Sequence, residues 1–208
     1  MIYKIKEGKG NIKEYDNDGA LLFEGEYSNG ERNGKGKEYD IQMKFEGEYL
    51  NGERNGKGKE YYYGGILKYE GEYLNGERWN GKGKEYDYFG KLEYEGEYLN
   101  GVRKGKGKEY DYFGKIKFEG EYLNGERKGK GKEYDDNGKI KFEGKYLNGE
   151  RNGKGKEYDD NGKIKFEGEY FNRVIYGKGK EYDYNGNLGR RIYKWRKMEW
   201  KRKRLMVN

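Results

Sequence analysis

The sequence contains no cysteine, histidine, proline or threonine, and Ser28 is its only serine. It can therefore build neither a disulfide framework nor a Cys/His zinc site, and it offers no thiol nucleophile, imidazole base or Ser-His-Asp triad. No apolar run approaches the roughly 20 residues that a membrane-spanning helix needs. We predict a non-enzymatic protein without catalytic residues, cofactor, metal or small-molecule substrate. The lack of cysteine fits an intracellular protein.

Aliphatic residues are scarce as well. Only 31% of the 208 residues are hydrophobic, whereas 41% are charged, a balance close to that of disordered chains. Two features oppose disorder: aromatic residues make up 17% of the chain, and its 38 glycines recur at regular spacing. A thick two-layer α/β domain would need more aliphatic residues for its core. The composition thus predicts a thin, repetitive and mostly solvated structure.

A repeat dominates the chain. The five-residue core Phe/Tyr-Glu-Gly-Glu-Tyr begins seven times, at intervals of 22 to 25 residues, and only Lys145 breaks it by replacing the second Glu. The starting positions are Phe23, Phe45, Tyr69, Tyr94, Phe118, Phe142 and Phe166. Trp79 is an insertion in the third unit, and residues 8–15 look like a leading half-repeat. Repetition at such a period indicates a stack of small structural units.

Each unit predicts a β-hairpin. The Asn-Gly dipeptide, as in Asn148-Gly149, tolerates the positive φ angles of a type I′ turn, and a second turn follows at sites such as Asn161-Gly162. A helix is disfavoured because glycine recurs in every candidate segment. Seven hairpins and a half predict roughly 15 strands in an open, twisted, single-layer antiparallel sheet about 70 Å long.

Alternation along the strands predicts two unlike faces, one with aromatic rings and one with solvated Lys and Glu. A two-residue turn at Asn148-Gly149 implies that Phe142 faces Gly155, Gly144 faces Gly153 and Glu143 faces Lys154, and the same counting pairs Glu119 with Lys130. A ring above a glycine would cover bare backbone. This register places Tyr158 away from the ring-bearing face. Two features could bring it back: a bulge near Gly153 or Gly155, or a three-residue loop at residues 160–162.

The repeated residues of the core carry the structural prediction. We expect the glycines to accommodate the rings and the tyrosines to pack beside them. The glycines are Gly25, Gly47, Gly71, Gly96, Gly120, Gly144 and Gly168. The tyrosines are Tyr27, Tyr49, Tyr73, Tyr98, Tyr122, Tyr146 and Tyr170.

At these residues the sequence resembles the MORN (membrane occupation and recognition nexus) repeat family. The fifth unit matches the family's spacing through Phe118, Gly120, Tyr122, Gly125, Gly129, Gly131 and Gly138, and the resemblance extends over about residues 8–189. Tyr stands where the family usually has Trp, and Asn152 or Lys128 where many members have His. The resemblance implies a β-sheet rod that acts as a scaffold or protein-interaction module in the cytoplasm, including the periphery of a membrane or the cytoskeleton. Self-association and phospholipid binding are implied as further roles. A related bacterial repeat group implies antitoxin-type partner binding as a remoter alternative.

The C-terminal segment differs from the repeats. We divide the chain into a repeat rod, residues 1–189, and a basic segment, residues 190–208, which we expect to cap the open edge near Tyr182 as a helix or strand, with Trp195 partly buried. The alternative is contact with an anionic membrane surface or another acidic partner. Nucleic acid is the less favoured partner. The contact residues would be Arg190, Arg191, Lys194, Trp195, Arg196, Lys197, Trp200, Lys201, Arg202, Lys203 and Arg204.

Overall fold

The computed structural model describes residues 8–194, which form one 17-stranded antiparallel sheet. Each strand pairs with the next in sequence except β7, because β7 and β8 both pair with β6 and β8 then pairs with β9. The strands are β1 (Lys9–Tyr15), β2 (Leu21–Ser28), β3 (Glu31–Asp40), β4 (Gln42–Leu50), β5 (Glu53–Tyr61), β6 (Leu67–Leu74), β7 (Glu77–Arg78), β8 (Gly81–Tyr86), β9 (Leu92–Leu99), β10 (Val102–Tyr110), β11 (Ile116–Leu123), β12 (Glu126–Tyr134), β13 (Ile140–Leu147), β14 (Glu150–Tyr158), β15 (Ile164–Phe171), β16 (Val174–Tyr182) and β17 (Leu188–Lys194).

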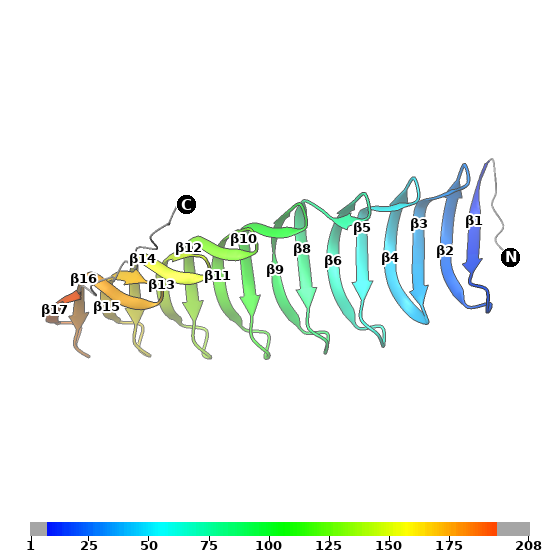
Figure 1. The fold of residues 1–208 in the computed structure, drawn as a ribbon. Coiled ribbons are helices and arrows are strands. Elements are labelled where there is room, and N and C mark those ends of the chain that lie inside the picture. Colours follow the sequence, from blue (N-terminus) through cyan, green and yellow to red (C-terminus); the bar gives the residue numbers. More distant parts are fainter. Residues whose placement is uncertain (1–7, 195–208) are drawn as a thin grey trace, which may run out of the picture.

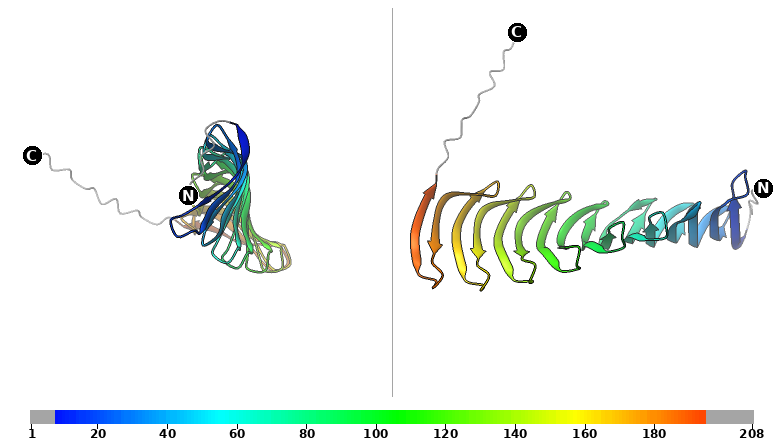
Figure 2. Two further views of the ribbon diagram at one scale, coloured as in Figure 1. Left: turned by 90° about the vertical axis from the view of Figure 1, so that its right-hand side faces the viewer. Right: turned by 90° about the horizontal axis from the view of Figure 1, so that it is seen from below.

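The sheet is a long ribbon, as the repeat predicts. The strands stand side by side from β1 at one end to β17 at the other (Figure 1). Views along and across the ribbon show its elongation and its twist (Figure 2). Among the described residues, no helix is long and apolar enough to cross a bilayer. The hairpin turns lie along the two long edges, which leaves both faces of the sheet continuous.

The turns confirm the predicted hairpins. Asn148 and Gly149 have φ angles of 50° and 79°, as a type I′ turn requires. At the opposite edge, Asp135 Oδ1 accepts the backbone N–H groups of Asn137 and Lys139, both at 2.9 Å. One edge is thus built on Asn-Gly turns and the other on turns that an aspartate side chain closes.

The sheet has two strands more than expected. One arises because the insertion at Trp79 interrupts a strand, leaving β7 and β8 to share the partner β6. The other is β17, which pairs with β16 and includes Arg190 and Ile192. The predicted boundary after residue 189 therefore falls inside a strand, and the start of the basic segment continues the sheet. Trp195 and the rest of the segment lie outside the described residues.

The predicted register holds only near the turn. Tyr146 pairs with Arg151, but a bulge then moves the register by two residues. Phe142 pairs with Glu157 instead of Gly155, Glu143 with Lys156 instead of Lys154, and Gly144 with Gly155 instead of Gly153. The hairpin of β11 and β12 shows the same shift, because Glu119 pairs with Lys132 instead of Lys130. Gly153, with φ 83°, lies in this bulge, as one of the alternatives supposed. The shift aligns glycine with glycine beneath the Phe142 ring.

Close approach explains this alignment. A Cβ atom on Gly144 would lie 2.6 Å from Phe142 Cζ and 2.7 Å from the Gly155 Cα. The ring thus rests on the backbone of both strands. Because the bulge moves the register by an even number of residues, Tyr158 is not returned to the ring-bearing face. Instead its hydroxyl donates to Glu143 Oε1, 2.6 Å away on the opposite face.

The core is a single line of aromatic rings on one side of the sheet, which we call the ring face. Phe118 is fully buried, and its ring makes edge-to-face contacts with Tyr122 at 5.8 Å and with Tyr146 of the next hairpin at 5.1 Å. All seven predicted tyrosines of the core are buried in this way. Edge-to-face contacts of this kind add to the apolar burial. The rings therefore join neighbouring hairpins as well as the strands within one.

Candidate functional site

The opposite side of the sheet carries a groove that extends over most of the ribbon, and we call this side the groove face. The groove has a volume of about 2200 Å³ and is lined from Ile12 on β1 to Arg191 on β17. Its floor consists of paired glycines such as Gly120 and Gly131. A Cβ atom on either glycine would point to the ring face, so the groove lies between the two rows of Glu and Lys side chains that flank the glycines along each strand. The Lys and Glu side chains form the walls.

The walls are striped by charge. In the hairpin of β11 and β12, Glu119 and Glu121 come from the first strand, and Lys130 and Lys132 come from the second. The same arrangement recurs in most hairpins, so that negative and positive strands alternate about every 4.8 Å along the ribbon. A partner that follows the groove therefore meets both signs of charge at a regular period.

Tyrosine hydroxyls hold one wall of the groove, the row that includes Glu119 and Lys132. Glu119 accepts the Tyr134 hydroxyl at 2.6 Å and lies 3.7 Å from Lys132 Nζ. Burial of the phenol and the adjacent carboxylate raise the pKa of Tyr134 to about 12. Equivalent Tyr–Glu bonds join Tyr39 to Glu24, Tyr61 to Glu46, Tyr86 to Glu70, Tyr110 to Glu95, Tyr158 to Glu143 and Tyr182 to Glu167.

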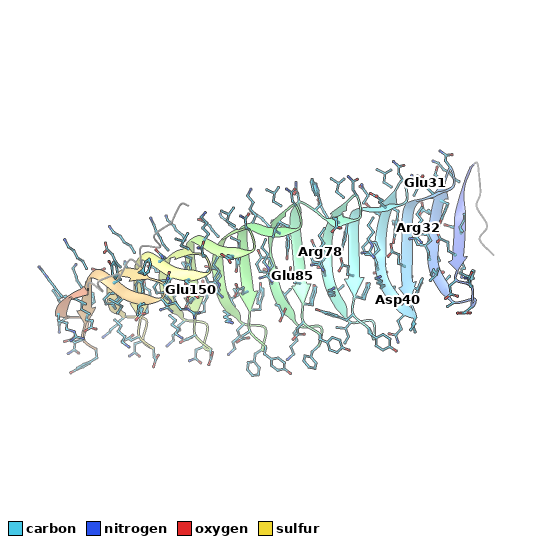
Figure 3. All side chains as sticks on the ribbon, in the orientation of Figure 1. Glu31, Arg32, Asp40, Arg78, Glu85 and Glu150 are labelled. Carbon is cyan, nitrogen blue, oxygen red and sulfur yellow. The ribbon has the colours of Figure 1, made fainter. Side chains whose placement is uncertain are left out.

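The ring face is closed by a ladder of arginines. The Arg127 guanidinium lies 4.1 Å above the centroid of Phe118, and its Nε donates to Glu109 Oε1 of the preceding hairpin at 2.9 Å. The Tyr122 hydroxyl donates to the same carboxylate at 2.8 Å. The pairs are Arg32–Glu14, Arg54–Glu38, Arg78–Glu60, Arg103–Glu85, Arg127–Glu109 and Arg151–Glu133. Figure 3 shows Arg32, Arg78 and Glu85 spread along the ribbon.

Electrostatics keeps these carboxylates ionised. Burial opposes the ionisation of Glu109, but the hydrogen bonds and charge of Arg127, together with the Tyr122 hydroxyl, outweigh it and lower its pKa. The same balance lowers the pKa of Glu38, Glu60 and Glu133. Apart from the buried hydroxyls of Tyr94 and Tyr170, which have no hydrogen-bond partner within residues 8–194, the ring face pairs its guanidinium groups and carboxylates within the chain and is built for stability. The open groove is the candidate functional site.

Exposed rings at one edge form a second distinctive surface. They occupy the tips of three consecutive hairpins and comprise Tyr63, Tyr88, Phe89, Tyr112 and Phe113, of which Phe113 is 81% exposed. The backbone does not require them: Asp111 accepts the same two N–H bonds in this turn as Asp135 does in a turn with polar tip residues. These rings add exposed apolar surface without changing the turn.

The sequence-predicted residues fall into three groups. The glycines of the core lie beneath the rings, where a Cβ atom would clash, and the tyrosines beside them are buried. In the basic segment, Arg190 is bound by Glu181 and Arg191 lines the end of the groove. Lys194 ends β17, and the segment's other predicted contact residues, from Trp195 to Arg204, lie outside the described residues. Their contact with an anionic membrane or acidic partner stays a prediction.

Sequence reasoning missed the arginine ladder and the second tyrosine row. Both leave a signal in the sequence, because Arg127 and Tyr134 recur with the same period as the Phe residues. What the sequence does not reveal is that Arg127 reaches back 18 residues to Glu109, since that contact depends on the pairing of different hairpins.

The fold and groove define a class: an open, single-layer β-repeat protein whose hairpins present a continuous binding face. The pattern described as MORN repeat matches residues 23–40, 45–66, 69–87 and 94–112, and that described as MORN repeat variant matches residues 79–100, 127–148 and 151–172. The chain belongs to the MORN repeat family. Repeats of this family generally serve in interactions, including those at membranes, and are generally not catalytic. A search of curated proteins found no match to the chain.

Proposed function

We propose that this protein is a non-enzymatic cytoplasmic scaffold whose groove binds a segment of a partner protein along the ribbon. The observation that carries the proposal is the contrast between the faces: the rings of one face are buried and covered by the arginines, whereas the groove of about 2200 Å³ on the other face stays open along the ribbon. Interaction sites are typically concave surfaces that combine apolar area with a few placed polar groups. Lysine stems and glycine backbone supply the apolar part here, and the charge stripes supply specificity.

The shape of the groove favours an elongated ligand. Its lining residues recur at every hairpin, so a compact ligand would find many equivalent positions, whereas a long segment would contact several stripes at once. An extended polypeptide advances about 3.3 Å per residue, so three residues span the roughly 9.6 Å between stripes of like sign. A partner segment with charges of one sign every third residue would thus match the groove.

The test is selection from a random library of long peptides, followed by lysine footprinting of the complexes. We expect bound peptides to protect Lys57 and Lys106 in the groove from acylation, while Lys104 and Lys128, exposed outside it, keep their reactivity. Selected peptides that protect Lys104 and Lys128 equally, or that are lost when Tyr112 and Phe113 are changed to Asp and Asn, would overturn the proposal in favour of another surface.

A further inference from the structure

One row of groove side chains departs from the alternation of charge. The row takes one residue from each strand between β3 and β16 except β7. Alternate neighbours are paired directly by the register, as Lys35 with Glu48 or Lys106 with Glu121, and the others lie beside each other across the bulge. In order, it comprises Lys35, Glu48, Lys57, Glu72, Lys82, Glu97, Lys106, Glu121, Lys130, Lys145, Lys154, Glu169 and Lys178. At β13 the expected Glu is Lys145, which pairs directly with Lys130. Three consecutive strands therefore present Lys130, Lys145 and Lys154, here called the lysine triad.

The charge of Lys145 does not stabilise the sheet. Like charges directly opposite each other in a sheet are destabilising. In other hairpins the equivalent carboxylate also accepts a backbone N–H at the bulge, as Glu48 does from Lys57 at 3.3 Å and Glu97 from Lys106 at 3.2 Å. At the bulge of β14, the aliphatic chain of Lys145 lies 3.5 Å from where a Cβ of Gly153 would be, and it offers no acceptor. The substitution thus breaks a local rule that six other hairpins keep.

The three charges are available to a ligand. All three lysines are exposed and line the groove, and within residues 8–194 none of them takes part in an ion pair. They lie on adjacent strands about 4.8 Å apart, so their ammonium groups form a short positive row roughly 10 Å long. Lys154 still has Glu169 directly opposite, as Lys35 has Glu48 and Lys106 has Glu121, whereas Lys130 and Lys145 face each other. The triad is therefore a local positive site within an otherwise balanced groove.

We propose that the lysine triad binds a short acidic run in the partner segment that the groove accommodates, an inference that rests on the proposed function. Glu121 on one side and Glu169 on the other bound the triad along its row. These carboxylates repel a continuous polyanion such as a nucleic acid, whereas a run of three or four acidic residues spans the triad at about 3.3 Å per residue. Basic residues on both sides of that run would then meet Glu121 and Glu169. The triad fixes the partner's register in a groove that otherwise repeats.

The probe is the end-blocked peptide Lys-Gly-Lys-Asp-Asp-Asp-Asp-Lys-Gly-Lys, titrated into the full-length protein by calorimetry at low salt. Its zero net charge minimises attraction to the basic C-terminal segment. We expect Lys145→Glu, which restores the residue of the other hairpins, to weaken binding about tenfold. Lys128→Glu has the same change of net charge on an exposed residue outside the groove and should stay within twofold of the wild type. Circular dichroism checks that every variant is folded.

A gain of function provides the second arm. Glu48→Lys creates an equivalent triad with Lys35 and Lys57, and in the Lys145→Glu background it should restore the lost affinity. Three outcomes would overturn the proposal: an unchanged affinity in Lys145→Glu, an equal loss in Lys128→Glu, or a single-stranded oligonucleotide that binds more tightly than the peptide through Lys145. Library peptides that protect groove lysines away from the triad would still support the proposed function. If the acidic peptide binds at the triad but library peptides do not protect the other groove lysines, the triad is a binding site and the proposed function of the whole groove is wrong.

Discussion

The two faces of this sheet share the same strands but differ in how their side chains are used and in what their substitutions change. On the ring face, Phe118 and Arg127 have equivalents in hairpin after hairpin, and their contacts are satisfied inside the chain. On the groove face, the charges point into an open channel, and the pattern changes at Lys145. The ring-face substitutions Tyr69 and Tyr94 keep a buried ring in place, whereas Lys145 reverses a charge in the open groove and is the candidate for recognition. Five changes test this division.

The largest effect is expected for Gly144→Val. The added Cβ would meet the Phe142 ring at 2.6 Å and the Gly155 backbone at 2.7 Å, so the ring must leave the sheet. We expect a loss of about 3 kcal/mol or more in the free energy of unfolding, measured by urea denaturation. Lys141→Val, on an exposed position of the adjacent groove face, should change it by less than about 0.5 kcal/mol. Equal effects would mean that the faces are assigned wrongly.

The arginine ladder gives the next effect. Arg127→Met keeps the apolar stem but leaves Glu109, whose side chain is only 20% exposed, without its cation. We expect a destabilisation of about 2 kcal/mol. The matched change in the groove, Lys132→Met, removes a cation that is 43% exposed and should cost less than about 0.5 kcal/mol. If both variants unfold at the same urea concentration, the ladder does not carry the stability of the ring face.

Acid should weaken the ring face through the same carboxylates. The pKa values of Glu38, Glu60, Glu109 and Glu133 are lowered in the folded protein, so their contribution is present above the unfolded-state pKa and is lost as the pH falls through the folded-state values. We expect the urea midpoint to fall progressively below about pH 4.5. In Arg127→Met this dependence should be shallower, because Glu109 no longer has its principal partner. A midpoint that is independent of pH down to 3 would contradict this account.

A smaller effect is expected for the tyrosine row of the groove. Tyr134→Phe removes a hydroxyl that donates to Glu119, and should cost about 1 kcal/mol. Tyr112→Phe, at an exposed hairpin tip, should be neutral. Thermal unfolding followed by circular dichroism distinguishes the two. A neutral Tyr134→Phe would show that this wall of the groove is not held by its hydrogen bond.

The smallest effect has the opposite sign. Lys145→Glu removes the like-charge pair with Lys130 and should stabilise the protein by up to about 0.5 kcal/mol, a gain that shrinks as salt is added. Glu121→Lys, which introduces the same like-charge arrangement one hairpin earlier, should be destabilising by a similar amount. A loss of stability in Lys145→Glu would mean that the lysine has a structural role after all.

Local chemistry made much of the fold predictable. Asn148-Gly149 specifies its own turn, and alternation places Phe142 and Tyr146 on one face whatever the long-range pairing is. Counting from the turn did not predict the register, because the pattern left open whether a bulge near Gly153 or Gly155 or a loop at residues 160–162 interrupts the pairing, and Gly153 forms the bulge. The groove was not predictable either. It lies between two rows of Lys and Glu side chains that leave each strand two residues apart, and it becomes continuous only when many strands pair side by side.

The arginine ladder also determines how the ribbon opens. Because Arg127 is held by Glu109 of the preceding hairpin, the stability of each hairpin depends on its contacts with the neighbouring hairpins as well as on its own strands. Ile175 takes the arginine's place in the last hairpin, so the ladder stops one unit before the end. Amide hydrogen exchange should therefore be fastest in the outermost hairpins and slowest in the middle, except near Trp79, where the interrupted strand divides the ribbon into two cooperative blocks.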